Sequence, residues 1–431
     1  MSRATPLHTR ILIGMLTGAS LGIAAHFLWG DSEWLRGLVD NVTIPAGKIF
    51  LRLIMMVVIP LVMSALILGV AELGDPRRLG RVGLRTLMFT ILLSSISVLV
   101  GVGAANLVRP GEGLSEETRA ALMQVIRSSA GTIAPPPAPK SGLQIVLDLI
   151  PENPVEAMTR AFQGDMIAVM VFALTLGIAL TTIDRPTADP LLRWLQALFD
   201  TVMKVIDFAM RLAPYGVGAL LFSLTARFGL EVLRLLAVYV FTVLAALLFH
   251  QVVTYSIVVR VFGGMSPTFF FTRIKEVMLT AFSTSSSNAT LPTTLRVAEK
   301  ELGVPRPIGH FVLTLGSTLN QNGTALYEGI TVIFLAQFFG VPLTLGGQVT
   351  VALLSILAGV GTAGVPGDSL PLVTALLVTV GVPAEGIAII LGVDRILDMC
   401  RTVLNVTGDV AVAVCVAKSE AAEAQVDGAA A

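Results

Sequence analysis

The chain has 431 residues, of which 54% are hydrophobic and 13% are charged, and its formal net charge is zero. A soluble protein carries about a quarter of its residues as Asp, Glu, Lys and Arg, so much of this surface does not face water. With a neutral charge balance, nothing indicates a nucleic-acid partner. The two cysteines, Cys400 and Cys415, lie in apolar surroundings and give neither a disulfide framework nor a metal-ligand spacing. The composition therefore indicates an integral membrane protein.

Apolar stretches of about 20 residues, the length at which a helix crosses a bilayer, recur along the whole chain. The stretches that predict membrane spans are centred on residues 11–28, 44–70, 87–108, 166–180, 195–221, 233–259, 308–338 and 383–416. No A-x-A cleavage site follows the first stretch, so we interpret it as an uncleaved span and not as a signal peptide.

Two further stretches, 266–298 and 348–382, are apolar at both ends and interrupted in the middle by small and polar residues. Basic residues flank the first on both sides, and the positive-inside rule places both flanks in the cytoplasm. The first stretch is therefore predicted to enter the membrane and turn back as a re-entrant hairpin. By analogy, the second is predicted to enter from the opposite side. Interrupted segments at matching positions of two internal repeats indicate a transporter with its binding site near the bilayer midplane.

The loops predict the orientation of the chain in the membrane. Arg77, Arg78, Arg81 and Arg85 cluster before the third span, which favours a cytoplasmic N-terminus. A polar, proline-rich segment after the third span is typical of an external loop. The small and polar residues after Lys418 predict a disordered cytoplasmic tail.

Ionisable residues follow one face of the last span. Asp394, Asp398, Arg401, Asn405 and Asp409 succeed one another at steps of four, three, four and four, which places them on one helical stripe. Burying such groups costs several kcal/mol, so they are interpreted as functional; an ion-pair network that only stabilises packing is the alternative. A guanidinium is suited to holding a carboxylate bidentately, and an aspartate to holding an ammonium group or a cation. The stripe therefore favours a ligand with a carboxylate and accommodates one with an amine.

The seventh span contains Asn320, Gln321, Asn322 and Gly323 in succession, a sequence that weakens a helix. An unwound stretch here would direct carbonyl oxygens at a cation, because hard cations prefer oxygen ligands. An ordinary polar interface between packed helices is the alternative.

The tips of the two interrupted segments offer backbone N–H groups at half-helix ends, which attract an anionic carboxylate. In the second tip, Gly361, Gly364 and Gly367 allow close backbone approach, which suits a gate. A polar loop lining a pore and a flexible hinge are the alternatives for the first and second tip.

Together these features resemble the glutamate transporter family, also called the dicarboxylate/amino acid:cation symporters. The matching motifs occur in the family's order: SSSNATLP at 285–292, NQNGTALY at 320–327, GTAGVPG at 361–367 and DMCRTVLNVTGD at 398–409. The resemblance implies an all-α integral membrane fold of eight transmembrane helices and two opposed re-entrant hairpins in inverted repeats. It also implies a homotrimer in the bacterial inner membrane, with both termini cytoplasmic and transport domains that move like elevators.

The resemblance also divides the chain into domains. The implied parts are scaffold helices 1 and 2 (1–76), helix 3 of the transport domain (77–112), an external loop (113–164), scaffold helices 4 and 5 (165–228), the remaining transport domain (229–418) and a disordered tail (419–431).

Site residues follow from the resemblance by position. Arg401 would hold the substrate's side-chain carboxylate and Asp398 its amino group. The residues that would complete the substrate site are Ser286, Ser287, Thr324, Gly364, Val365, Thr402 and Asn405. One sodium site would comprise Asp409 and the carbonyl oxygens of Gly316, Asn320 and Asn405. A second would comprise the carbonyl oxygens of Thr318, Gln321, Gly359, Val360 and Thr362.

The chain departs from the family pattern at the family's third sodium site. Asn322 stands where sodium-coupled members carry an aspartate, and Leu93–Ser94 aligns with their Thr–Ser pair. One charged ligand and one hydroxyl are missing, so we expect fewer sodium ions per cycle or partial coupling to protons. Ser285 replaces an arginine that some members place in the first hairpin, and Arg395, one turn before Asp398, is positioned to substitute for that charge.

Asp368 adds a negative charge to the predicted gate. It would oppose a simple dianion, recruit a substrate with an extra donor or supply a protonatable group, and the sequence does not choose among these.

The predicted function is symport of an acidic amino acid (glutamate or aspartate) or a C4 dicarboxylate with Na⁺, H⁺ or both, without a resident cofactor. The partners are a small carboxylate substrate and the lipid bilayer. The alternatives are a carrier of neutral amino acids or other carboxylates in the same fold, a passive anion channel and an intramembrane aspartyl protease.

Overall fold

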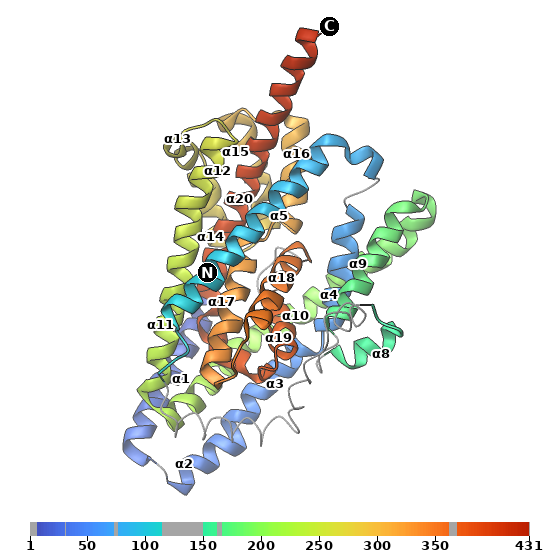
Figure 1. Cartoon of the computed structure of the whole chain (residues 1–431). Helices are drawn as coiled ribbons and strands as arrows, with labels where there is room; N and C mark the ends of the chain where they lie inside the picture. The colour runs from blue at the N-terminus through green and yellow to red at the C-terminus, as the bar shows by residue number, and fades with distance from the viewer. Residues whose placement is uncertain are drawn as a thin grey trace, which may run out of the picture.

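The computed structural model describes residues 7–30, 32–72, 76–113, 150–161, 166–361 and 369–430. Within these ranges every regular element is a helix and no strand is present, which confirms the predicted all-α class (Figure 1). Most of the predicted external loop, the tip of the second interrupted segment and Asp368 lie outside the described residues.

Each predicted apolar stretch coincides with helix. The corresponding elements are α1 (Leu7–Trp29), α3 (Ile44–Met55) with α4 (Val58–Glu72), α5 (Pro76–Val108), α9 (Met166–Thr182), α10 (Arg185–Phe228), α11 (Leu230–Phe249) with α12 (Tyr255–Val261), α16 (Arg306–Leu319) with α17 (Asn322–Phe339), and α20 (Ile387–Ala430). The connecting elements are α2 (Glu33–Leu38), α8 (Pro154–Thr159), α13 (Pro267–Arg273), the π-helical turns Val39–Thr43 and His250–Thr254, and a 3₁₀ turn at Ala384–Gly386.

Several helices have the length and composition of membrane spans. Among the described residues four continuous helices qualify: Thr9–Trp29, Arg81–Val108, Leu230–Val261 and Val393–Glu423. A fifth qualifies if α10, bent by 51° between Ile206 and Arg211, is counted as one span. Pro214 accounts for this bend, because its ring clashes with the carbonyl four residues earlier.

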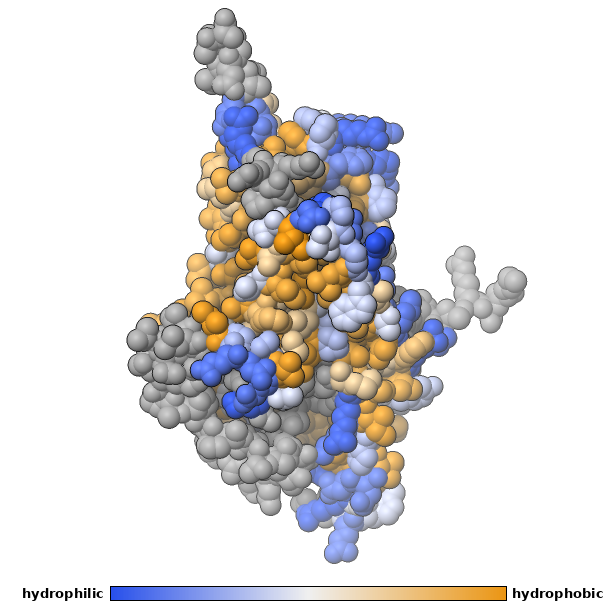
Figure 2. All heavy atoms as spheres, turned by 90° about the vertical axis from the view of Figure 1, so that its right-hand side faces the viewer, coloured by the Kyte–Doolittle hydropathy of each residue, from blue (hydrophilic) through white to orange (hydrophobic). Residues whose placement is uncertain are grey.

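The surface carries the apolar belt that a membrane requires. On the face drawn in Figure 2, hydrophobic residues cover the middle of the molecule and hydrophilic residues gather towards the upper and lower ends. Large apolar side chains such as Leu99, Phe241 and Leu353 are more than 60% exposed. In water such a surface would be an association site, whereas in a bilayer it faces lipid.

Helices α1 and α10 pack at unusually close range. Gly14 and Gly18 lie one turn apart on α1, and a Cβ atom at Gly18 would lie 2.1 Å from the carbonyl oxygen of Gly218. The Thr225 hydroxyl donates to the carbonyl of Ala19 at 3.2 Å. Small residues at such spacing let two membrane helices approach backbone to backbone.

Helices α14 (Lys275–Thr284) and α15 (Ser287–Leu302) form a hairpin in the first interrupted segment. Ser285 turns the chain with a left-handed backbone (φ 50°), and the Ser286 hydroxyl caps α15 by accepting from the amide of Ala289 at 3.2 Å. Ion pairs between Arg273 and Glu301, and between Arg296 and Glu276, join the two open ends, so the helices run antiparallel.

Helix α17 lies at the centre of the largest hydrophobic core. All of its residues except Gln337 are buried, and it packs against α5, α11, α18 (Leu345–Gly361), α19 (Ser369–Thr379) and α20. A separate core joins α4, α9 and part of α10 to Ala358 of α18 and to Leu372 and Ala375 of α19. The helices expected to form the scaffold are not segregated in a core of their own, because Ile11 of α1, Phe50 of α3 and Val217 of α10 belong to the main core around α17.

The tail after Lys418 differs from the prediction. Instead of being disordered, it continues α20 as a helix to Ala430 and projects beyond the rest of the molecule (Figure 1). Ala and Glu are strong helix formers. Glu420 and Glu423 also form ion pairs with Arg81 and Arg85 near the start of α5, which fixes the first turns of the extension.

Candidate functional site

The candidate site forms around a break between two helices. α16 ends at Leu319, and α17 begins at Asn322 after two residues with non-helical backbone, Asn320 (φ −111°, ψ 57°) and Gln321 (φ −91°, ψ 59°). The Gln321 amide donates to the carbonyl of Gly359, near the end of α18, at 3.3 Å. The predicted unwinding is thus confirmed at this point. The C-terminal end of α18, the first arm of the second interrupted segment, lies against the break.

The stripe on α20 packs directly on the break. The Asn405 amide donates to the Gln321 side-chain oxygen at 2.5 Å and to the Thr324 hydroxyl at 3.2 Å, and its oxygen accepts from the amide of Gly323 at 2.7 Å. A Cβ atom at Gly323 would lie 2.7 Å from the Arg401 carbonyl oxygen. Only glycine allows α17 and α20 to approach this closely.

Arg401 is the most enclosed charge of the site, with a side chain 1% exposed. Its guanidinium lies 2.8 Å from an Asp398 carboxylate oxygen and 3.1 Å from an Asp394 oxygen. The face of the Tyr327 ring covers it, with the guanidinium carbon 3.9 Å from the ring centroid. The Arg401 Nε–H is buried and has no hydrogen-bond partner among the described residues.

A second arginine completes a balanced cluster. Arg395 lies 3.1 Å from the other oxygen of Asp398. Two arginines and two aspartates give a formal charge of zero. Asp398 thus bridges the two arginines.

Asp409 provides a different environment about two turns beyond Arg401 along α20. Its side chain accepts from the Asn320 amide at 2.9 Å, and a Cβ atom at Gly316 would lie 2.6 Å from the same oxygen. No basic side chain in the described ranges pairs with it, and the Asn320 side-chain oxygen is buried without a partner. A buried carboxylate beside an unsatisfied oxygen has the chemistry of a cation site, because a buried charge needs a partner or a metal.

Asn322 closes a hydrogen-bond network where the third sodium site was expected to be incomplete. Its side-chain oxygen accepts from Ser94 at 2.8 Å, and its amide donates to the Tyr255 hydroxyl at 3.2 Å. Tyr255 in turn donates to the Leu404 carbonyl at 3.0 Å, while Leu93 is fully buried in the apolar core. The polar groups here satisfy one another without a charge.

Comparison with known proteins places this arrangement in a family. A sequence profile of the sodium:dicarboxylate symporter family matches residues 7–419. The chain belongs to the sodium:dicarboxylate symporter family.

Relatives in the family cover nearly the whole chain. The Escherichia coli (strain K12) proton/glutamate-aspartate symporter is 35% identical over 413 residues, which are 95% of this chain and 92% of the relative. The proton/sodium-glutamate symport protein of Bacillus subtilis (strain 168) is 35% identical over 416 residues, 96% and 92% of the two chains. C4-dicarboxylate transport protein 3 of Ralstonia nicotianae is 30% identical over 405 residues, 94% and 86%.

Membership confirms the predicted function at the level of the family. This sodium:dicarboxylate symporter is a multi-pass membrane transporter and not an enzyme. It transports small dicarboxylates, a class that includes acidic amino acids because they carry two carboxylates, together with a cation. The resemblance inferred from the motifs is confirmed as well.

The structure brings most predicted site residues of this symporter together and leaves some outside its described ranges. Those that touch one another directly or through one shared neighbour are Gly316, Asn320, Gln321, Thr324, Asp398, Arg401, Thr402, Asn405 and Asp409. The Ser287 hydroxyl is buried without a partner at the first hairpin tip. Thr362, Gly364 and Val365 lie outside the described residues.

One residue of α17 that contacts the site was missed. Tyr327 covers Arg401 and donates to Asp394 at 2.8 Å. It follows Thr324 by three residues, so helical spacing alone identifies it as a neighbour of the site.

Proposed function

We propose that this symporter imports glutamate, aspartate or a C4 dicarboxylate, and that Arg401 binds a substrate carboxylate. The observation that carries the proposal is the buried guanidinium held between Asp394, Asp398 and the Tyr327 ring. A guanidinium has five donors, and each aspartate uses one in this geometry. The remaining donors, including the unpartnered Nε–H, are available to a carboxylate without breaking the internal ion pairs.

The environment of Arg401 makes it selective for an anion. Its position is fixed by two carboxylates and one ring, so little side-chain entropy is lost on binding. A buried donor without a partner costs about 1–3 kcal/mol, which a bound carboxylate recovers. Asp398 then holds the amino group of an amino acid substrate, since each of its oxygens accepts one hydrogen bond from an arginine and keeps a second lone pair.

Charge balance argues for coupling to a cation. The cluster of Arg395, Arg401, Asp394 and Asp398 is neutral before binding, so an acidic amino acid adds one negative charge and a C4 dicarboxylate adds two. Uptake of a cation at Asp409, between Asn320 and Gly316, offsets that charge. The carbonyl oxygens near Gln321 and Gly359 support a second sodium position, to which Thr318, Val360 and Thr362 would contribute.

We infer that fewer sodium ions are coupled than in relatives that use a full set of sites. The support is the neutral network of Asn322, Ser94 and Tyr255, whose polar atoms bond one another. Without a charged ligand, the dehydration of a sodium ion at this point is not compensated. Protons supply the remaining coupling in this proposal.

The proposal also includes the architecture of the transporter. It comprises eight spans and two opposed hairpins, a homotrimer in a bacterial inner membrane with cytoplasmic termini, and elevator movement. Two small hydrophobic clusters, one between α1, α2 and α10 and one between α4 and α10, join scaffold helices only and support a scaffold. The antiparallel α14–α15 pair, with charged residues at its open end and small hydroxyl residues at its tip, supports the first hairpin.

Purified chain in proteoliposomes tests the proposed function. Uptake of labelled aspartate, glutamate and succinate is measured under an inward sodium gradient, an inward proton gradient, both or neither. We expect accumulation above equilibrium with at least one cation gradient and shallow sodium dependence. Equilibration without accumulation would support a passive channel, and steep cooperativity driven by sodium alone would refute reduced coupling.

A further inference from the structure

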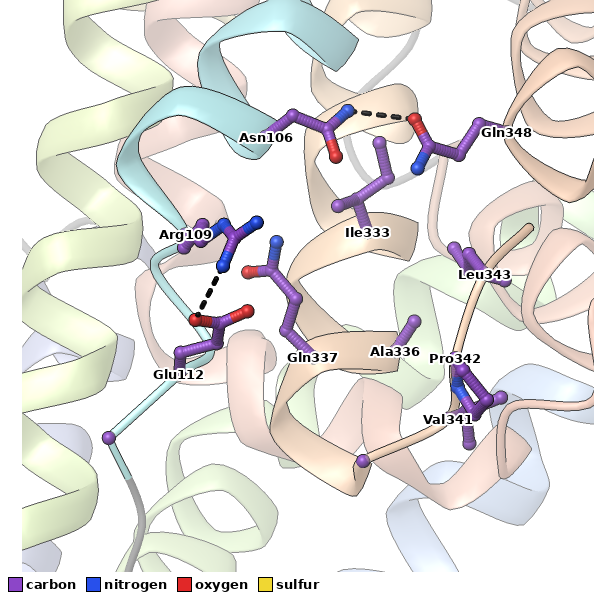
Figure 3. A pocket seen from close by; sticks show the side chains of 12 residues that line it. Asn106, Arg109, Glu112, Ile333, Ala336, Gln337, Val341, Pro342, Leu343 and Gln348 are labelled. Atoms are coloured by element: carbon purple, nitrogen blue, oxygen red, sulfur yellow. Dashed lines mark hydrogen bonds and ion pairs between the residues drawn. The ribbon is translucent and has the colours of Figure 1, made fainter. Parts of the chain in front are cut away.

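A cavity separate from the candidate substrate site lies between the C-terminal end of α5, the C-terminal end of α17 and the start of α18 (Figure 3). Its volume of about 620 Å³ is in the range of small-molecule sites. None of its lining residues belongs to the clusters around Arg401, Asp409 or Asn322. The cavity therefore needs an explanation of its own.

The two sides of the cavity differ in chemistry. Figure 3 shows Arg109, Glu112 and Gln337 close together on one side, with apolar Pro342 and Leu343 on the other. A site with one charged wall and one apolar wall fits a small ligand that has charged groups at one end and a hydrocarbon part at the other.

Hydrogen bonds hold the amide groups of the lining in place. Gln337 donates to the Ala105 carbonyl at 3.2 Å and accepts from the Gly111 amide at 3.1 Å. Asn106 donates to Gln348 at 2.8 Å and so joins α5 to α18 across the top of the cavity (Figure 3). The amide side chains of the lining are therefore preorganised, whereas the charged side chains of Arg109 and Glu112 are not held by them.

Arg109 occupies a backbone position where glycine is usual. It follows α5 with φ 50°, in the left-handed region, and its amide closes the helix by donating to the Ala105 carbonyl at 3.0 Å. A residue with a Cβ atom is strained there, and such strain persists where the side chain has a task. At this position the guanidinium is directed to the cavity.

Arg109 and Glu112 form a pair that a ligand can separate. Their charged groups are 3.4 Å apart, and the side chains are 65% and 50% exposed. A pair this exposed and this long contributes little by itself. One positive and one negative group make the lining neutral overall, so it matches neither a simple anion nor a simple cation.

We propose that this cavity binds a small zwitterionic amino acid with an aliphatic side chain. Its carboxylate accepts from the Arg109 guanidinium, and its ammonium group donates to the Glu112 carboxylate. The aliphatic side chain lies against Pro342 and Leu343. The site is independent of the proposed transport of acidic substrates through Arg401.

Equilibrium dialysis of full-length protein in nanodiscs with labelled L-leucine tests the proposal. We expect one saturable site per chain in the unaltered protein and in Arg401→Cys. Arg109→Gln and Glu112→Gln should each weaken binding about tenfold or more, since each removes a charge-assisted hydrogen bond. Arg211→Gln, which alters an exposed arginine of α10, serves as the matched control and should bind like the unaltered protein.

Two leucine derivatives separate a zwitterion site from simpler ones. N-acetyl-leucine keeps the carboxylate, leucinamide keeps the amine, and both should bind at least about tenfold more weakly than leucine. Equal binding of N-acetyl-leucine would replace the proposal with an anion site. The proposal would be overturned if leucine showed no saturable binding, if binding were lost in Arg401→Cys, or if it persisted in both Arg109→Gln and Glu112→Gln. Aspartate uptake by Arg109→Gln should be unchanged, which keeps this result separate from the proposed transport function.

Discussion

The guanidinium of Arg401 is stacked on the ring of Tyr327, with the guanidinium carbon 3.9 Å from the ring centroid, and the Tyr327 hydroxyl donates to Asp394 at 2.8 Å. One tyrosine thus positions both the cation and one of its counter-ions. The substrate clamp is therefore an assembly of α17 and α20 and not a property of the α20 stripe alone.

This relationship predicts graded effects of replacing Tyr327. Tyr327→Phe keeps the stacking but removes the hydrogen bond to Asp394, and we expect aspartate affinity to fall about tenfold. Tyr327→Leu also removes the cation–π contact, worth about 2 kcal/mol when desolvated, for a further loss of roughly 30-fold. Isothermal titration with aspartate checks both, with the exposed Tyr215→Leu as control. Unaltered affinity in Tyr327→Leu would show that Arg401 needs no support from α17.

Asp409 predicts a sodium-dependent stability. Sodium binding at about 100 times its dissociation constant stabilises the folded state by about 2.7 kcal/mol, and so raises the melting temperature. Asp409→Asn removes the charged ligand and should reduce this rise to what the second proposed sodium position contributes, while Asp200→Asn, an exposed change in α10, should retain it in full. Thermal unfolding in sodium and in choline buffers measures the difference. A rise of equal size in Asp409→Asn would place the sodium ion elsewhere.

The network around Asn322 predicts a gain of function. Asn322→Asp combined with Leu93→Thr adds one carboxylate and one hydroxyl beside Ser94, and so recreates a hard-cation ligand set. We expect the sodium dependence of aspartate uptake to become steeper, with a Hill coefficient higher by about one if the new site is coupled. Asn322→Ala with Leu93→Thr lacks the charge and is the matched control. The same steepening in that control would exclude a new cation site as its cause.

Close packing of α1 on α10 predicts a strong position effect among glycines. Gly18→Ala places a methyl group 2.1 Å from the Gly218 carbonyl oxygen, so the helices must separate, which we expect to cost about 1–3 kcal/mol. Gly103→Ala in α5 meets nothing within 4 Å and should gain up to about 1 kcal/mol of helix stability. Melting temperatures of the two variants in the same detergent should move in opposite directions. A harmless Gly18→Ala would contradict the α1–α10 packing.

Local sequence patterns predicted the central features of the site because those features lie within single segments. The steps between Asp394 and Asp409 follow from helical spacing, and the break at Asn320 and Gln321 follows from weak helix formers in succession. The first hairpin was also apparent, since its flanking charges and its small tip residues are close in the chain.

Contacts between segments far apart in the chain could not be predicted in this way. The hydrogen bond between Ser94 and Asn322 joins α5 to α17 across 228 residues. The sequence therefore showed that Asn322 replaces a charged cation ligand, but it did not show the hydrogen bonds that Asn322 makes instead. The tail was mispredicted for the same reason: its composition is typical of disorder, but Glu420 and Glu423 meet Arg81 and Arg85 only after folding.

The most direct test of the carboxylate clamp is counterflow in proteoliposomes that contain Arg401→Cys. Vesicles loaded with unlabelled aspartate, succinate or serine are diluted into the same labelled compound, alongside unaltered protein and the Arg211→Gln control. We expect Arg401→Cys to lose counterflow of aspartate and succinate while both comparison proteins retain it, with any residual exchange confined to serine. Undiminished counterflow of aspartate or succinate by Arg401→Cys would contradict the assignment of Arg401 as the group that binds the substrate carboxylate.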